Sequence, residues 1–421
     1  MSLGLTDDER GMLAGDRGPA LKLAMGLVAK AAKIMGAERL VPVSFAHIDA
    51  CFYTGQSHVD FARYLADHGA KPAVITWTNN GVVSLANPEL RDERDDPGMV
   101  RGARAVMELY AAMGFVPTWT CAPYQLSGGP GLGDHIAAGE SNAVSYYNSV
   151  VGARTNKYGD YLDVACALTG KAPYAGLHLD EGRRAGLHID AGTLPENWRG
   201  DDLFPHLLGY VAGRIAGTRV PVISGIPKAT PLYGLKAVSS AVAAAGGVEL
   251  WHGLGVTPEA PALECVFAGG ETHVLHTDDL RRAHRDLSTA RDGPLDAVAL
   301  GTPHFGLEEF RALVRLLDGR RVKTGLPVIV TTSRAVRAIA AEQGLITTLE
   351  KAGVQTPVDV CSYYSPRIRA LKGRVMTNAA KWAYYAPGML GVEVAFGSLK
   401  ECAESAVRGE VWRDPASWVA A

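Results

Sequence analysis

The sequence carries six cysteines, and their spacing decides which thiol chemistry is open to it. They stand at positions 51, 121, 166, 265, 361 and 402, and no C-x-x-C pair occurs. Local zinc and ferredoxin-type motifs depend on such close pairs. Any site that shares these thiols must therefore be assembled by the fold from distant segments.

Cys121 lies in PTWTCAPYQ (117–125). This pattern predicts a strand that ends at the cysteine, because Ala-Pro prevents the strand from continuing. It fits a thiol held toward a site, and it also fits a small buried apolar residue. Cys166 recurs with apolar residues at helical spacing and is predicted as core, and Cys265 is predicted as packing.

Polar side chains follow several predicted strands. His47 and Asp49 lie in SFAHIDAC (44–51), Asn378 and Lys381 lie in VMTNAAK (375–381), and Arg334 ends TTSR. One such residue alone is usually a cap or a turn residue. Because α/β enzymes collect function at the C-terminal ends of their strands, the joint occurrence indicates an active site.

The segment 139–184 is the densest in polar side chains between small apolar residues. It includes Glu140, Ser141, Asn142, Asn148, Arg154, Thr155, Asn156 and Asp160. Such groups bind a small carboxylated substrate, with Arg154 as the anion partner. The alternative is a polar network that ties two lobes together. The preceding run LSGGPGLGDH (126–135) matches no phosphate-loop pattern and is interpreted as a mobile flank.

These residues must be positioned by alternating strands and helices. Strands are predicted at 39–45, 71–77, 219–226, 295–301 and 326–333, and helices at 61–69, 100–114 and 307–319. The alternation predicts α/β layers with largely parallel sheets. Polar segments at 191–205 and 284–295 mark uncertain internal boundaries.

Composition excludes several classes of protein. The chain has 421 residues, 47% of them hydrophobic and 20% charged, with a net charge of −2. The charge balance gives no support to nucleic-acid binding. Without a signal peptide or an apolar run near 18 residues, the sequence predicts a cytoplasmic protein that neither binds a membrane nor forms disulfides.

A set of longer strings resembles the large catalytic part of the aconitase X family, from about residue 5 to about residue 412. These strings are ERLVPVSFAHIDAC, PTWTCAPYQ, ESNAVSYYNSVVGARTN, GKAPYAGLHLDE, HGLGVTPEAP, GTPHFG, VMTNAAK and LKECAESAVRGE. The resemblance implies a three-lobed, aconitase-like α/β body that occupies residues 1–421 and lacks the swivel domain. It also implies a small swivel-domain subunit as partner.

The resemblance further implies a hydro-lyase that uses an iron–sulfur cluster held by three cysteines. Water elimination suits such a cluster, because an iron with an open position takes the leaving hydroxyl. We expect Cys121, Cys361 and Cys402 as ligands, with Cys51 as the replacement. The cluster type (2Fe-2S, 3Fe-4S or 4Fe-4S) stays open.

Roles for the other residues follow from the same resemblance. His47, Asp49 and Lys381 are the expected catalytic residues. Substrate binding is expected from Ser44, Ser141, Asn142, Arg154, Asn156, Arg334 and Asn378. The expected substrate is cis-3-hydroxy-L-proline, with mevalonate 5-phosphate as the alternative.

Two rival hypotheses remain beside this one. A single metal held by His47, Asp49 and a cysteine also suits mixed nitrogen, oxygen and sulfur ligation. A cluster-bearing sensor or scaffold without activity is the other, because the chain has Ala379 and Tyr384 where the family has serine and histidine. Thr302 also stands where some members have cysteine.

Overall fold

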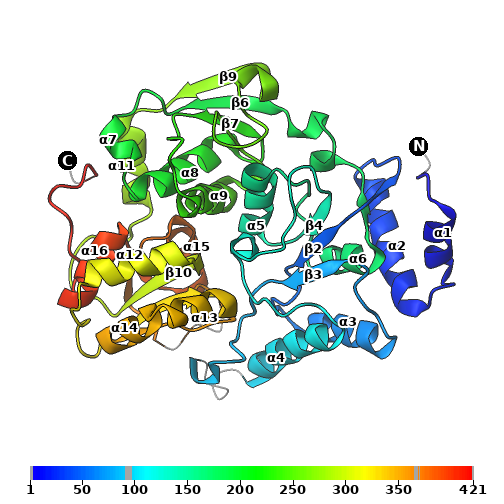
Figure 1. The fold of residues 1–421 in the computed structure, drawn as a ribbon, viewed down its shortest axis with the longest axis horizontal. Helices are drawn as coiled ribbons and strands as arrows, with labels where there is room; N and C mark the ends of the chain where they lie inside the picture. The colour runs from blue at the N-terminus through cyan, green and yellow to red at the C-terminus, as the bar shows by residue number, and fades with distance from the viewer. Residues whose placement is uncertain (1–2, 91–96, 365–367, 369, 420–421) are drawn as a thin grey trace.

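Three α/β regions follow one another along the chain, each with its own sheet (Figure 1). A computed structural model describes residues 3–90, 97–364, 368 and 370–419. The sheet orders are β3-β2-β4, β8-β7-β6-β9 and β12-β11-β10-β13-β14. All of their strand pairs are parallel. The fold class predicted from the alternation is confirmed.

The first region places the short strand β2 at the centre of its sheet. Its elements are α1 (Asp7–Ala14), α2 (Pro19–Ile34), β1 (Leu40–Pro42), β2 (Phe45–Ile48), α3 (Gln56–Asp67), β3 (Ile75–Thr78), α4 (Pro97–Ala112), β4 (Ile136–Ala138), α5 (Ser141–Tyr146), α6 (Leu162–Thr169) and β5 (Lys171–Pro173). Short 3₁₀ or π turns cover Pro88–Leu90, Pro123–Gln125, Tyr147–Val151, Gly176–His178 and Glu181–Arg183. All four side chains of β2 are buried, so its C-terminal end opens into the interior.

The second region packs two apolar helices, α8 and α9, against each other. Its elements are β6 (Ala185–Asp190), α7 (Glu196–Arg199), α8 (Leu203–Ala216), β7 (Pro221–Ser224), α9 (Leu232–Gly246), β8 (His252–Gly253), α10 (Leu263–Val266), β9 (Phe267–Val274) and α11 (Thr277–Asp286). Gly209 and Gly213 allow the close approach, because a Cβ at either would lie 2.7 Å from a carbonyl oxygen of α9.

The third region is built on the fully buried strand β10. Its elements are β10 (Ala297–Phe305), α12 (Leu307–Leu317), β11 (Val328–Thr332), α13 (Arg334–Glu342), α14 (Leu345–Ala352), β12 (Val354–Gln355), β13 (Arg374–Thr377), α15 (Ala380–Leu390), β14 (Glu393–Phe396) and α16 (Leu399–Arg408). Continuous burial is typical of a parallel strand with helices on both faces.

Two predicted strands differ from the structure. The segment 39–45 divides between β1, which pairs antiparallel with β5, and the start of β2. The segment 117–121 is not a strand, since Trp119 has a φ of 42° and interrupts the extended backbone. Hydrogen bonds to Thr78 hold the segment beside the sheet, such as Thr118 Oγ1 to the Thr78 carbonyl at 2.8 Å.

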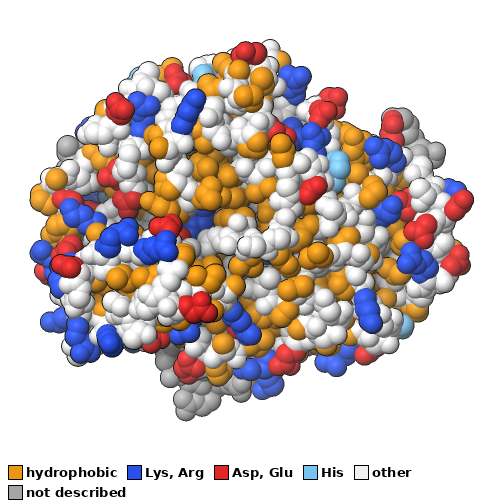
Figure 2. Space-filling view, in the orientation of Figure 1, with side chains coloured by type: hydrophobic (Ala, Val, Ile, Leu, Met, Phe, Trp, Pro, Cys, Tyr) orange, Lys and Arg blue, Asp and Glu red, His pale blue; other side chains and the backbone are white. Residues whose placement is uncertain are grey.

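The surface shows no concentration of one charge on the face drawn in Figure 2, where acidic and basic side chains are interspersed. Within the described ranges, none of the helices has the length and apolar character needed to cross a membrane.

Candidate active site

The main chain just beyond β3 connects the segments that carry Cys121 and Cys361. Gly81 forms a parallel bridge with Val360, and the Gly81 carbonyl accepts from Cys361 N–H at 3.4 Å. Thr120 N–H donates to the Thr78 carbonyl at 3.2 Å. Segments of the first and third regions thereby meet at the C-terminal ends of their strands.

Cys121 and Cys361 are brought together at this junction. Both side chains are buried, and both interact electrostatically with Glu140 and Lys381. Burial is the main cause that raises the pKa of both thiols, that of Cys361 to about 11. Glu140 and the neighbouring Cys361 raise the pKa of Cys121 further.

Backbone N–H groups oppose the effect of burial on these thiols. His304 N–H donates to Cys121 Sγ at 3.4 Å. Hydrogen bonds from the backbone of Tyr363 and Ser362 lower the pKa of Cys361. Such donors stabilise a negative sulfur and offset part of the effect of burial, but the pKa of both thiols stays above its usual value.

A buried ion pair lies beside the thiols. Lys381 Nζ is 2.5 Å from Glu140 Oε1, and it donates to Ser141 Oγ at 3.2 Å. Glu140 is the N-cap of α5 and accepts Ala143 N–H at 2.6 Å. Burial alone would raise the pKa of Glu140 and lower that of Lys381. Their mutual attraction outweighs it, so the pKa of Glu140 is lowered, the pKa of Lys381 is raised, and both groups are charged at neutral pH.

β2 contributes a neutral base, and the residue that follows it is a weak acid. His47 Nε2 lies 3.0 Å from the Thr120 carbonyl, so it carries the proton, and the buried Nδ1 has no hydrogen-bond partner among the described residues. Burial lowers the pKa of His47 to about 4. For Asp49, burial first and then Asp160 and Glu140 raise the pKa to about 7. Asp49 therefore exchanges its proton near neutral pH.

Cys402 does not join the two thiols. It lies in α16 and packs in the apolar core of the third region with Leu399 and Ala406. Burial first, and then Glu401 and Asp202, raises the pKa of its thiol. The electrostatic neighbours of Cys402 are different from those of Cys121 and Cys361.

The remaining cysteines have separate surroundings. Cys166 is core, as its spacing predicts. The prediction for Cys265 was wrong, because its side chain is exposed. Cys51 is buried, and after burial itself the carboxylates of Asp163 and Asp49 raise its pKa, so its neighbours are acids.

Asn142 lies beside Cys121, whereas Asn378 lines a cavity. Asn142 Nδ2 donates to the Cys121 carbonyl at 2.9 Å and to the Tyr124 hydroxyl at 2.8 Å, so it fixes the cysteine segment. Asn378 and Thr302 line a cavity of about 240 Å³ between α8, α9 and the third region. Asn378 Oδ1 is buried without a hydrogen-bond partner in the part of the chain described.

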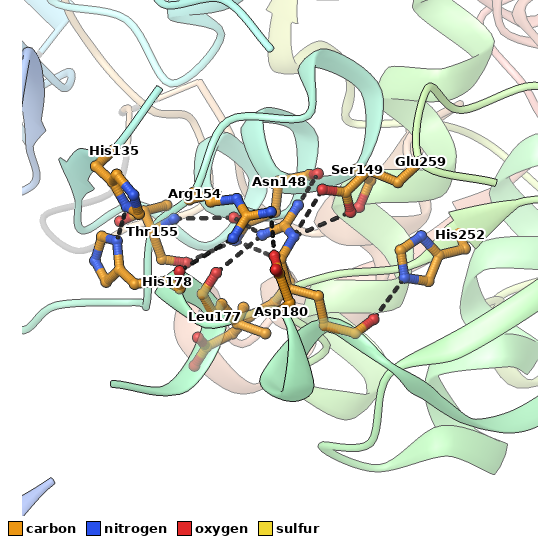
Figure 3. A network of polar contacts seen from close by, with 12 residues as sticks. His135, Asn148, Ser149, Arg154, Thr155, Leu177, His178, Asp180, His252 and Glu259 are labelled. Atoms are coloured by element: carbon orange, nitrogen blue, oxygen red, sulfur yellow. Dashed lines mark hydrogen bonds and ion pairs between the residues drawn. The ribbon is translucent and has the colours of Figure 1, made fainter. Parts of the chain in front are cut away.

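Arg154 and Asn156 belong to a second group of polar residues, which we call the Arg154 network. Figure 3 shows Arg154 among its neighbours His135, His178 and Asp180. Arg154 lies 2.5 Å from Asp180 Oδ1 and donates to the His178 carbonyl at 3.2 Å. Asn156 binds Leu177 N–H and the Ala175 carbonyl. The network comprises His135, Asn148, Arg154, Asn156, His178, Asp180, Arg183 and Glu259.

Arg334 and Ser44 also lie apart from the thiols. Arg334 contacts both carboxylate oxygens of Asp359 at 2.7 Å, with 47% of its side chain exposed. Ser44 is exposed at the N-terminal end of β2, where its Oγ donates to the His135 carbonyl at 3.4 Å. It therefore faces away from the end of the strand that carries Asp49.

Two functional residues escaped sequence reasoning. Glu140 entered only as one of many polar residues of its segment, and its signal was its place before a helix, directly after β4. His304 entered only within GTPHFG, yet it contacts Cys121. A side chain that connects two distant segments leaves no periodic pattern in the sequence.

A cluster held by three cysteines of this chain does not fit these contacts. Two thiols converge, and the third expected ligand, Cys402, lies in a core. Within the described ranges, no three His, Cys, Asp or Glu side chains are grouped so that they could hold a metal ion.

Comparisons with known proteins match nearly the whole chain. Models of the aconitase X first, second and third domains match residues 2–181, 187–285 and 295–408. A solved structure of aconitase X from Thermococcus kodakaraensis, in its holo form, superimposes with a TM-score of 0.86 and 32% identity. It covers 96% of this chain and 100% of that one.

Curated relatives are of two kinds. The cis-3-hydroxy-L-proline dehydratases of Pseudomonas aeruginosa and Hypocrea jecorina are 40% and 38% identical to the chain. The alignments cover 97% of this chain and 70% and 69% of theirs. The phosphomevalonate dehydratase large subunit of Methanocaldococcus jannaschii is 32% identical, and the alignment covers 94% of this chain and 98% of that protein. The chain therefore belongs to the aconitase X family.

Proposed function

We propose that the chain is the large subunit of a hydro-lyase that eliminates water from a small hydroxy acid. The observation that carries the proposal is the meeting of Cys121, Cys361, Asp49 and Lys381 around Glu140. Perturbed acids and bases of this kind gather where protons are moved. The relatives, all named dehydratases, support the same reaction class.

The side chains divide the reaction between them. The Lys381 ammonium, kept charged by Glu140, attracts the carboxylate of the substrate. Asp49, with a pKa of about 7, transfers a proton to or from the reacting carbon or hydroxyl. His47 offers the lone pair of Nδ1 to a substrate O–H or N–H. Elimination removes one proton and one hydroxyl group, which leave as water.

The proposed substrate is cis-3-hydroxy-L-proline. The charge of the centre supports a substrate with one carboxylate, because Lys381 is the cation beside the thiols. Arg334, beside Asp359, and Arg154, beside Asp180, lie apart from the thiols. A phosphate substrate would require more cationic groups. Mevalonate 5-phosphate is the second candidate, favoured by the 32% identity to the Methanocaldococcus jannaschii phosphomevalonate dehydratase large subunit.

The family suggests an iron–sulfur cluster, and its type and ligands form part of the proposal. We propose Cys121 and Cys361 as the thiols that this chain provides. Protein purified without oxygen is assayed for iron and acid-labile sulfide. Iron together with sulfide supports a cluster, whereas iron without sulfide supports a mononuclear metal.

The proposed partner is a small subunit with a swivel-type domain, and residues 1–421 act together as its large partner. The name of the Methanocaldococcus jannaschii relative, a large subunit, supports this arrangement. Co-expression with a candidate small subunit, followed by an assay for loss of water from both substrates, tests the function. No turnover of either substrate by an iron-loaded pair would overturn the proposal.

A further inference from the structure

His304 makes contacts with both thiol segments. Its Nδ1 lies 3.0 Å from Thr120 Oγ1 and its Nε2 lies 3.2 Å from the Val360 carbonyl. Thr120 immediately precedes Cys121, and Val360 immediately precedes Cys361. A single imidazole ring therefore connects the two residues that stand before the two thiols.

The hydrogen-bond pattern fixes the form of the ring. The Val360 carbonyl only accepts, so Nε2 carries the proton and Nδ1 is an acceptor. The Thr120 hydroxyl then donates to Nδ1, while its oxygen accepts Ala122 N–H at 3.1 Å. Both ring nitrogens are satisfied, and His304 is buried. A ring held at both nitrogens has no freedom to turn.

The main chain of His304 is held as firmly as its ring. Its carbonyl accepts from Lys236 Nζ and from Gln125 Nε2, both at 2.9 Å. Lys236 is buried in α9 and also pairs with Glu309. The contacts of His304 thus come from all three regions of the chain, with Gln125 from the first, Lys236 from the second and Val360 from the third.

We propose that His304 is a positioning residue that sets the separation of the Cys121 and Cys361 thiols. Its N–H contact to Cys121 Sγ at 3.4 Å adds a direct bond to one of them. Partners of this kind, one step removed from a ligand, typically change metal affinity by about 10–100-fold when they are replaced. The inference concerns the site of the proposed function, but its test uses no substrate, so the two can fail separately.

The test measures Cd²⁺ binding to the reduced, metal-free full chain, because Cd²⁺ is soft and prefers thiolates. The ultraviolet charge-transfer absorption of Cd²⁺–thiolate bonds counts the bound thiols. We expect one Cd²⁺ held by two thiolates. Cys121→Ser and Cys361→Ser should each remove this signal, and Cys402→Ser should keep it.

Variants of His304 then separate positioning from packing. His304→Ala should weaken Cd²⁺ binding about 10–100-fold. His304→Gln, whose amide can both donate and accept, should recover most of the affinity. His188→Ala is the matched control, since His188 is a half-buried histidine bonded to Ser224 Oγ at 3.1 Å in the second region.

Thr120→Val removes one hydroxyl at nearly constant volume. It is the second test of the same hydrogen bond in case His304→Ala does not fold. It should weaken Cd²⁺ binding while near-ultraviolet circular dichroism stays native. Unchanged affinity in folded His304→Ala, or in Thr120→Val if His304→Ala does not fold, would overturn the positioning role. Equal losses in the Ala and Gln variants would overturn the hydrogen-bond explanation, and a wild-type signal from fewer than two thiolates would overturn the pairing.

Discussion

The thiol centre (Cys121, Glu140, Cys361 and Lys381, with His47 and Asp49) and the Arg154 network are both groups of polar residues, and the network reaches the surface at the exposed Asp180. They differ in how completely their groups are satisfied. In the centre, His47 Nδ1 has no hydrogen-bond partner among the described residues, and Asp49 has a pKa of about 7. In the network, Arg183 binds Glu259, Asn148 and the Leu177 carbonyl.

The difference separates a site from a structural junction. A buried polar group without a partner lowers stability, so it persists where it serves a ligand or a reaction. A network whose donors meet acceptors within the chain contributes to stability and has little left for a substrate. Polar composition alone does not distinguish the two, but the partners of each atom do.

The largest effect is expected from Lys381→Met. It leaves Glu140 buried without its counter-charge, which should lower the free energy of unfolding by about 3–5 kcal/mol. Turnover should fall about 10–100-fold, because the substrate carboxylate loses its cation and a hydrogen bond to a charged group contributes about 1.5–3 kcal/mol. Urea unfolding and steady-state assays measure the two effects.

A double variant separates stability from catalysis at this pair. Glu140→Gln combined with Lys381→Met removes both charges, so it should recover much of the stability while activity stays absent. Recovery of activity in the double variant would show that the pair is structural, as in the Arg154 network.

The next largest difference is expected between the iron contents of Cys361→Ser and Cys402→Ser. Cys361→Ser should remove the bound iron of the anaerobically purified protein, because a hydroxyl replaces a soft ligand. Cys402→Ser should keep the iron and lower the free energy of unfolding by about 1–3 kcal/mol, since it buries a hydroxyl in an apolar core. Iron content per chain is the measurement. Equal iron loss in both variants would return Cys402 to the ligand set.

Arg183→Met tests the network directly. Arg183 is buried and paired with the half-buried Glu259, so its loss should lower the free energy of unfolding by about 2–3 kcal/mol. The kcat of the protein that remains folded should change less than about 2-fold, because no contact of Arg183 reaches the thiol centre. A large fall in kcat at unchanged stability would place the network in the active site.

Per pH unit, the smallest effect is the loss of stability in acid, and its slope should be equal in the two regions. Burial first of all lowers the pKa of His47 to about 4 and that of His178, in the network, to about 3. Below the unfolded pKa of about 6.5 the unfolded chain binds more protons than the native one. Stability should therefore fall as pH falls from about 6.5 to 4, by up to about 1.4 kcal/mol per pH unit for each histidine.

Replacement of either histidine by glutamine should reduce the slope of the free energy of unfolding against pH, by an amount that corresponds to about one bound proton. Urea unfolding at several pH values between 4.5 and about 7 gives the slope. An unchanged slope in His178→Gln, with a reduced slope in His47→Gln, would show that the network already releases its histidine to solvent.

The sequence predicted the α/β alternation because buried parallel strands such as β10 and β11 leave continuous apolar runs. It also placed His47, Asp49 and Lys381 at strand ends. It did not predict that segment 117–121 is irregular, since the positive φ of Trp119 has no signal in residue type. The sequence also did not predict which side chains pair with each other, because no local pattern shows that Asp180 pairs with Arg154.

Cys402 was expected to be a ligand because of the resemblance to the family, although its spacing indicates a buried helix position. Leu399, Cys402, Ala403 and Ala406 recur at helical spacing in LKECAESAV, and all four are buried in α16. The same argument that assigned Cys166 to the core applies to Cys402. Periodicity was the better guide to burial at both positions.

The pairing of Glu140 with Lys381 joins residues 241 positions apart in the chain. At ordinary rates of translation, about 5–20 residues per second, Lys381 is synthesised about 10–50 seconds after Glu140. During that interval the nascent first region holds a carboxylate whose counter-ion has not yet been made, and Cys121 waits equally long for Cys361. Biosynthesis thus imposes an order in which any metal loading comes after translation is nearly complete.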